Sequence, residues 1–398
     1  MRYLFLLFFL IMPLQHADSA WFNNAWNYKV KVEVNPNKVG TSSPITNLPT
    51  YVDLAGMPST FWTNASSTGA DIRVVESDEV TETAFELVSF STTTKKGELH
   101  FLADGPLSTS SASSTFYIYY GNATATAYAT SSTYGASNVW SSGYKAMWHL
   151  SESSGSAFDS TANINTATNT NSVAFTTGKI YNSASTTRAS AQRLGAPDST
   201  SLSLTGTTSI SFWLNLTTLP ASGEVYGLVT KDTAGATQRA YWIDYYNNAG
   251  SYQLRYGIHV DGGGTNFSYS YITQTFTVGT WYHVTVKTIP ANSIGTKFEF
   301  YVDGVYKGNG TASNNGTGAT SIYDSLTATY LGAYASAGIY MNGKMDEVSI
   351  QNTSLSFSQI LTEYNNESST STFLWIGPEE AKSSSSTPST SDEIFWFE

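Results

Sequence analysis

The sequence contains no cysteine among its 398 residues. Disulfide bonds, thiolate metal sites and a cysteine nucleophile are therefore excluded. The folded chain must instead be stabilised by packed cores, for which 10 Trp, 26 Tyr and 20 Phe supply large apolar side chains.

Charge is also scarce, because Asp, Glu, Lys and Arg make up only 12% of the chain. The usual share in soluble proteins is roughly 25%. The formal net charge is −11 and the isoelectric point is near 4.9. This balance argues against nucleic acid or anionic membrane as a partner. The abundance of Ser, Thr, Gly, Asn and Tyr is typical of extracellular β-proteins.

Long apolar runs are missing after the N-terminus. The first 20 residues, "MRYLFLLFFLIMPLQHADSA", place one Arg before an apolar stretch and small residues after it. This layout predicts a secretory signal peptide over residues 1–20, with an uncleaved N-terminal anchor as the alternative. No later segment approaches the length of a membrane span, so we expect no transmembrane segment beyond the signal and a secreted or cell-surface protein.

Helical periodicity is nearly absent, and residues 356–366 are the one helix candidate. Strand patterns are frequent: residues 28–34, "YKVKVEV", alternate apolar and charged side chains. Asp303-Gly304 predicts a two-residue hairpin. We therefore predict an all-β fold of two β-sandwich domains, over 21–138 and 139–378. A Ser/Thr/Ala-rich stretch near 138 marks the boundary, and a low-complexity tail follows over 379–398.

Residues 21–138 carry four segments in order: "WFNNAWNYKVKVEV", "GADIRVVESD", "FELVSF" and "STFYIYYGN". Together they resemble the secreted domain-of-unknown-function family 2341. The resemblance implies a β-sandwich, and it brings no agreed chemistry.

Residues 139–378 carry five segments that resemble another family. They are "MWHLSESSGSAFDST", "TSISFWL", "WYHVTVK", "FYVDGVYKG" and "YMNGKMDEVSIQNTSLSFSQI". They resemble the concanavalin A-like jelly roll in its laminin-G-like form. The resemblance implies the fold, but not an activity, because this fold hosts lectins, adhesion modules, hydrolases and lyases.

The adjacent acids Asp346 and Glu347 invite a comparison with glycosidases. In a strand, neighbouring side chains point to opposite faces, so these two cannot act on one substrate. Glu299 and Asp303 share a face but would lie about 13 Å apart. No H-x-H or H-E-x-x-H spacing occurs, so we do not expect a zinc site. No G-x-S-x-G or P-loop spacing occurs either. We identify no catalytic residues, and we expect a protein without catalysis rather than an enzyme.

A structural calcium ion is implied by the jelly-roll resemblance. Its ligands would be Glu152, a group around Asp159 to Asn165, and Asp346, brought together because the first and last strands of such a roll lie side by side. The alternative is that Asp346 accepts hydrogen bonds from backbone amides in the turn from Glu152 to Asp159. Glu347 is expected to face solvent.

The segment 239–271 has the densest mixture of aromatic and polar residues. Trp242, Asp244 and Tyr246 share one strand face, and the opposite face carries Ile243, which favours the core. In the following strand Arg255 and His259 point outward, and His259 is the histidine best placed to meet a ligand. Sugar rings stack on exposed aromatic side chains surrounded by polar groups, so we predict these five as ligand-binding residues.

The sequence thus predicts a secreted or cell-surface binding or adhesion protein that recognises a glycan or another surface protein through its second domain. Two alternatives stay open. One is a polysaccharide-acting lyase or hydrolase using His259, Arg255 and a tyrosine. The other is a structural subunit of the cell envelope.

Overall fold

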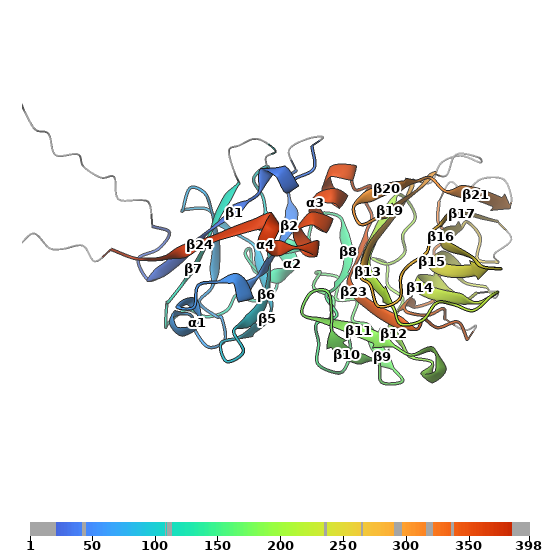
Figure 1. The fold of residues 1–398 in the computed structure, drawn as a ribbon, viewed down its shortest axis with the longest axis horizontal. Coiled ribbons are helices and arrows are strands. Elements are labelled where there is room, and N and C mark those ends of the chain that lie inside the picture. Colours follow the sequence, from blue (N-terminus) through green and yellow to red (C-terminus); the bar gives the residue numbers. More distant parts are fainter. Residues whose placement is uncertain are drawn as a thin grey trace, which may run out of the picture.

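Two β domains lie side by side along the length of the molecule (Figure 1). The computed structural model describes residues 21–41, 45–107, 109, 114–234, 237–263, 266–289, 297–315, 321–335 and 338–383. The predicted signal peptide and most of the predicted tail lie outside these ranges. None of the helices in the described ranges is long and apolar enough to cross a membrane.

The first domain is a sandwich of two antiparallel sheets. One sheet has the order β24-β1-β7-β3-β4 and the other the order β2-β6-β5. Val30, Val32 and Val34 alternate toward a core that also contains Phe61 and Phe116, which confirms the predicted strand over 28–34. The strands are β1 (Tyr28–Val34), β2 (Leu48–Asp53), β3 (Arg73–Glu76), β4 (Glu82–Thr83), β5 (Phe85–Ser91), β6 (Lys96–Ala103), β7 (Thr115–Tyr120) and β24 (Leu374–Ala381).

The position of β24 corrects the predicted domain boundary. Residues 374–381 do not belong to the second domain or to a tail, because β24 pairs with β1 from Tyr28 to Val34. The chain therefore returns to complete the first domain, as the red strand beside the blue one shows in Figure 1. Leu374 contributes to the first core. A strand that closes a sheet from the far end of the chain carries no sign of its partner in its own residues.

The second domain is a larger antiparallel sandwich. One sheet runs β10-β11-β23-β13-β18-β19-β20, with β8 also paired to β23, and the other runs β21-β17-β16-β15-β14-β22-β12-β9. The first contains β8 (Tyr144–Trp148), β10 (Ala174–Thr177), β11 (Asn182–Thr186), β13 (Thr208–Leu216), β18 (Tyr282–Ile289), β19 (Lys297–Val302), β20 (Val305–Gly308) and β23 (Gly343–Gln351). The second contains β9 (Thr168–Thr170), β12 (Arg193–Ala196), β14 (Val225–Asp232), β15 (Arg239–Asn248), β16 (Ser251–His259), β17 (Phe267–Thr273), β21 (Thr311–Asn315) and β22 (Thr329–Leu331).

Strand alternation in this sandwich follows the prediction. Tyr241, Ile243 and Tyr245 of β15 are fully buried in the core between the two sheets. The first and last long strands of the domain, β8 and β23, pair with each other. Asp303 and Gly304 both have positive φ angles in the β19–β20 turn, as a type I′ hairpin requires. The all-β fold class is therefore confirmed.

Helices are few and short, and the longest lies between the domains. Helix α3 (Phe357–Ser368) confirms the helix predicted over 356–366, and a capping box of Ser356 and Gln359 starts it. Asn366 of α3 exchanges hydrogen bonds with the backbone of Tyr51 in β2, which ties the helix to the first domain. The remaining helical turns are α1 (Phe61–Asn64), α2 (Ala136–Val139), α4 (Thr370–Phe373), η1 (Pro36–Lys38), η2 (Leu54–Gly56) and η3 (Arg188–Ser190).

Candidate functional site

A cavity of about 300 Å³ lies on the sheet that contains β14 to β17, on the face turned away from the core. Its floor and walls come from the four strands β14, β15, β16 and β17 and from the loops that carry Ala234, Tyr334 and Ile339. The lining residues are Val225, Ala234, Arg239, Trp242, Asp244, Arg255, His259, Phe267, Tyr269, Tyr334 and Ile339. We refer to it as the outer-face cavity.

The indole of Trp242 lies against the backbone of the next strand. Trp242 pairs with Gly257 across β15 and β16, and a Cβ atom at Gly257 would lie 2.3 Å from Trp242 Cζ2. Only glycine leaves room for the ring there. The ring also packs against Tyr269, with centroids 5.6 Å apart. Trp242 Nε1 is buried and has no hydrogen-bond partner within the described part of the chain.

His259 is the second residue on the cavity wall with buried nitrogen atoms that lack hydrogen-bond partners among the described residues. Its side chain is almost fully buried, and neither ring nitrogen makes a hydrogen bond to a described residue. Nε2 lies 3.2 Å from Asp232 Oδ2, close enough for an ion pair when the ring is protonated, but not aligned for a hydrogen bond. Asp232 itself is held by Arg239 Nε at 3.1 Å from each oxygen. Buried polar groups without partners are rare, so two of them on one cavity are a signal of a ligand.

A rigid polar group forms another part of the wall. Arg255 donates from Nε and Nη2 to the two oxygens of Asp244, both at 2.7 Å, and Tyr334 donates its hydroxyl to Asp244 at 2.8 Å. Burial raises the pKa of Asp244, although Arg255 opposes the rise. Burial also raises the pKa of Tyr334 well above its ordinary value. The guanidinium of Arg255 lies 4.4 Å from the ring centroid of Tyr246.

The structure therefore brings the five predicted ligand-binding residues together on adjacent strands, but with different exposures than expected. Trp242, Asp244, Arg255 and His259 line the cavity, and Tyr246 lies behind Arg255. Trp242 and His259 were expected to be exposed, and they are only 7% and 2% exposed. The reason is local packing: Gly257 and Tyr269 cover the indole, and Phe267 packs against the imidazole. That they bind a ligand stays a prediction.

Sequence reasoning missed two of the aromatic side chains at this cavity. Phe267 and Tyr269 alternate along β17, so they share its outer face, and their rings stack with centroids 6.0 Å apart. The pattern "FSYSY" contained that signal, because aromatic residues at alternate positions on a polar strand mark an exposed aromatic face.

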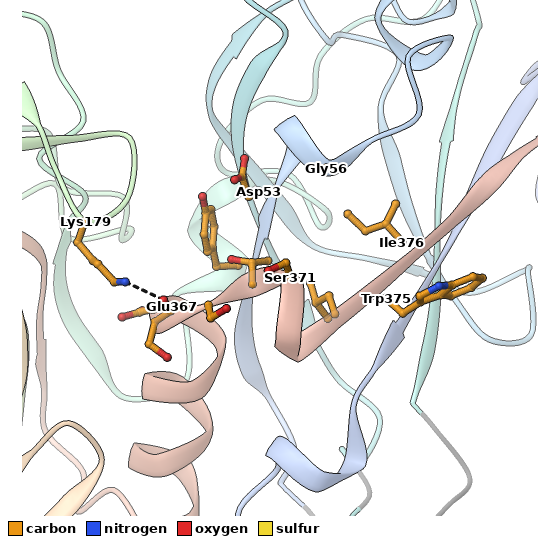
Figure 2. A pocket seen from close by; sticks show the side chains of 12 residues that line it. Asp53, Gly56, Lys179, Glu367, Ser371, Trp375 and Ile376 are labelled. Atoms are coloured by element: carbon orange, nitrogen blue, oxygen red, sulfur yellow. Dashed lines mark hydrogen bonds between the residues drawn. The ribbon is translucent and has the colours of Figure 1, made fainter.

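A second cavity, of about 440 Å³, lies between the domains beside helices α3 and α4. Lys179 extends from the second domain toward the end of α3 and donates a hydrogen bond to the carbonyl of Ser368 at 2.7 Å (Figure 2). Asp53 of the first domain and the half-exposed Trp375 of β24 also line it. Hydroxyl groups of residues 368–371 make this interdomain cavity mainly polar.

The three acids predicted to hold calcium each accept hydrogen bonds from backbone amides. Glu152 accepts from Phe158 at 2.7 Å, and Asp159 accepts from Met147 at 3.0 Å. Asp346 accepts from Lys179 and Ile180 at 2.7 and 2.9 Å. Among the described residues, the two groups of side chains able to surround a metal ion do not include these acids. Calcium bound by them stays a prediction, and the structure does not gather them around one point.

Glu347 corrects another expectation, because it does not face solvent. It is 3% exposed and has a φ angle of 48° at a bulge in β23. Both of its carboxylate oxygens lie 3.0 Å from His149 Nδ1. The bulge breaks the strand alternation that was expected to put Asp346 and Glu347 on opposite faces: Met345 and Val348 on either side both lie in the core, so both acids point away from it, although to different partners. The first domain covers the face on which Glu347 lies, which the sequence of the second domain alone does not indicate.

His149 and Glu347 belong to a buried cluster at the domain interface. The first domain adds Glu98 and His100, which alternate on β6, and Glu86 from β5. Although burial lowers the pKa of His149, Glu347 and Glu86 outweigh it and raise that pKa well above its ordinary value. Burial lowers the pKa of His100. In the sequence, "ELH" places Glu98 and His100 at alternate strand positions, which share a face, so the pattern weakly indicated that these two side chains lie together.

Residues 188–361 match the family model described as "Concanavalin A-like lectin/glucanases superfamily". The match lies within the second sandwich and confirms a concanavalin A-like domain there. No curated protein matches the chain. The resemblance of residues 21–138 to the domain-of-unknown-function family 2341 stays a prediction.

Similar solved structures include domain 4 of an extracellular arabinanase from Geobacillus stearothermophilus, in complex with arabinotriose. It is 20% identical, with a TM-score of 0.40, over 56% of this chain and 98% of that one. The botulinum neurotoxin serotype D ligand binding domain, in complex with N-acetylneuraminic acid, is 12% identical, with a TM-score of 0.39, over 56% of this chain and 50% of that one. This chain thus spans about half the length of the toxin domain. Arabinotriose and N-acetylneuraminic acid are ligands of those two proteins.

Proposed function

We propose that this is a secreted or cell-surface protein without catalytic activity that binds a glycan in the outer-face cavity of its second domain. One observation carries the proposal. Two buried polar side chains, Trp242 and His259, line a cavity of about 300 Å³ with nitrogen atoms that have no hydrogen-bond partner among the described residues. Leaving such groups unpaired costs about 1–3 kcal/mol each, and a ligand hydroxyl removes that cost.

The chemistry of the cavity suits a sugar. A sugar hydroxyl both donates and accepts hydrogen bonds, so it can pair with the Trp242 N–H and with either state of the His259 ring. The half-buried rings of Phe267 and Tyr269 offer apolar faces for the C–H side of a pyranose. The Asp244–Arg255 pair is already formed without a ligand, so it supplies a fixed wall that needs no reordering on binding.

Binding is favoured over catalysis because two of the three groups that a lyase would need, Arg255 and the tyrosine, are already engaged. Arg255 is held by Asp244 in a bidentate ion pair. The raised pKa of Tyr334 makes its hydroxyl a poor base near neutral pH. The first domain then serves as a companion or spacer that presents the second.

The test is binding of the purified protein to a glycan array, followed by affinity measurement for the best glycan. We expect binding that is lost in Trp242→Ala and weakened about two- to tenfold in Tyr269→Ala, since an aromatic stacking contact contributes about 0.5–1.5 kcal/mol. The matched control is Tyr306→Ala, which removes an exposed tyrosine from β20 of the other sheet and leaves affinity unchanged.

The alternatives give different results in the same experiment. Release of reducing ends or unsaturated sugars from a polysaccharide panel would establish an enzyme. No binding to any glycan, together with no sugar release, would overturn the proposal and leave a structural envelope subunit.

A further inference from the structure

Four buried side chains from two domains converge at the interface between β6, β8 and β23. Glu98 and His100 come from the first domain, and His149 and Glu347 come from the second. One potential ligand atom of each lies within 4.8 Å of the other three. All four residues are at most 4% exposed. We refer to them as the interface tetrad.

The spacing of these atoms fits a tetrahedral metal site. Zinc binds His nitrogen and Glu oxygen at about 2.0–2.2 Å, so neighbouring ligand atoms in a zinc tetrahedron lie about 3.3–3.6 Å apart. Glu98 Oε1 lies 3.2 Å from His100 Nε2 and 3.4 Å from His149 Nδ1. Glu347 Oε1 lies 3.0 Å from His149 Nδ1. Movements of a few tenths of an ångström would bring these three edges to the required length, and the other three are no longer than 4.8 Å and can contract onto an ion.

The surrounding residues hydrogen-bond to two of the four potential ligands and fix their orientation, as residues around a metal site do. His149 turns its other nitrogen, Nε2, toward Glu86 at 3.2 Å. Glu86 is itself fixed by Trp140 at 2.5 Å and by Ser160 at 2.6 Å. Ser151 donates to Glu98 Oε2 at 2.6 Å, which leaves Oε1 for the centre. A carboxylate behind a ligating histidine fixes the ring and raises its basicity as a ligand.

The charges of the surrounding carboxylates independently favour a bound cation. Three carboxylates, of Glu86, Glu98 and Glu347, are gathered in a water-poor interface around two histidines. Buried carboxylates are costly unless positive charge or protons compensate them. A divalent cation at the centre supplies two positive charges at the point where the carboxylates converge.

We propose that the interface tetrad binds one Zn²⁺ ion, which joins the two domains through two ligands from each. Four protein ligands and no cysteine make this a closed His₂Glu₂ site with a structural role. Binding requires both imidazoles neutral, so any proton held on His149 Nδ1 is released to solvent. The site differs from the predicted calcium site, because it shares no residue with Glu152, Asp159 or Asp346.

The experiment uses the full chain, stripped with a chelator, reloaded with ZnCl₂ and desalted. We expect one zinc per chain by elemental analysis and a higher melting temperature than in the stripped protein. Cobalt loading should give the visible absorption bands of a tetrahedral ion. His100→Gln and Glu347→Gln should each lose stoichiometric zinc. Glu86→Gln should keep one zinc but bind it about 10–100-fold more weakly.

The matched control is His283→Gln, in the second described group able to surround a metal, with Glu363 and Glu367. That variant should retain one zinc. If a tetrad variant fails to fold, X-ray absorption of the zinc-loaded wild type still decides, because the site requires two imidazoles and only nitrogen and oxygen neighbours. Substoichiometric zinc in the wild type, an octahedral cobalt spectrum, or zinc retained in both His100→Gln and Glu347→Gln would overturn the proposal.

Discussion

Two histidines of this protein are both almost fully buried but differ in their surroundings. His149, at the domain interface, lies within 3.4 Å of carboxylate oxygens from Glu86, Glu98 and Glu347. His259, on the outer-face cavity, has one carboxylate nearby, with Asp232 Oδ2 3.2 Å from Nε2, and makes no hydrogen bond to any described residue. Burial alone therefore does not reveal the role of a histidine. The partners do: saturated polar groups hold a structure together, whereas unsaturated groups beside a cavity are available to a ligand.

The largest expected difference is in stability. In the protein stripped of metal, His149→Ala leaves three buried carboxylates without the imidazolium that faces them, so we expect it to lower the free energy of unfolding by about 3–5 kcal/mol. His259→Ala leaves Asp232 paired with Arg239, so we expect a loss of about 1 kcal/mol. Urea or thermal denaturation of both variants measures this difference. Equal losses would show that the two surroundings are energetically alike, contrary to our interpretation.

The second prediction concerns ligand binding at the outer-face cavity. Trp242→Phe keeps an aromatic ring but removes the unpaired N–H, so glycan affinity should fall about tenfold, the value of one hydrogen bond of up to about 1.5 kcal/mol. Gly257→Ala places a methyl group 2.3 Å from Trp242 Cζ2 and must displace the ring, so affinity should fall at least as far. Titration calorimetry measures both.

The matched control for the glycine is Gly263→Ala. No atom of the described residues lies within 4 Å of the position that its Cβ would take, so affinity should not change. Unchanged affinity in Trp242→Phe and Gly257→Ala as well would remove Trp242 from the binding site.

The fold could be predicted from local patterns more fully than the sites could. Alternation placed Trp242 and Arg255 on the outer face of the second sandwich, because that face is decided within each strand. The interface tetrad was not predicted, because His100 and Glu347 lie far apart in the sequence and meet only when two domains pack. For the same reason Glu347 was assigned to solvent. The segment 374–381 was assigned to the wrong domain because the sequence of a strand does not show which other strand it pairs with, and here the partner, β1, lies at the other end of the chain.

The third prediction is a pH dependence that belongs to the interface and not to the outer face. Burial and the neighbouring Glu363 raise the pKa of Glu367 to about 7. Because this pKa is higher in the folded than in the unfolded protein, the stabilisation is complete below about pH 4.5 and is lost as pH rises through 7. The pKa of His283 beside it is also raised, mainly by Glu363 against the effect of burial, and acts in the same direction.

In the protein stripped of metal, melting temperatures between pH 5 and 8 should therefore decline in the wild type, and Glu367→Gln should flatten the decline. Gln retains an oxygen that can accept the hydrogen bond from Trp213 Nε1, so the substitution preserves local packing. A decline of unchanged slope in this variant would assign the pH dependence to other groups.

The smallest expected effect separates the two cavities. Trp375 is the largest aromatic side chain on the interdomain cavity and is 53% exposed. Its exposure means that Trp375→Ala should change the free energy of unfolding by no more than about 0.5 kcal/mol. If glycans bind in the outer-face cavity, this variant should also keep its affinity within twofold, measured on the glycan that the wild type prefers. An exposed tryptophan among hydroxyl groups is nevertheless what a sugar site can look like, so the variant tests the comparison directly. Loss of binding in Trp375→Ala, with binding retained in Trp242→Phe, would transfer the glycan site to the interdomain cavity and leave the unpaired nitrogens of Trp242 and His259 without a role.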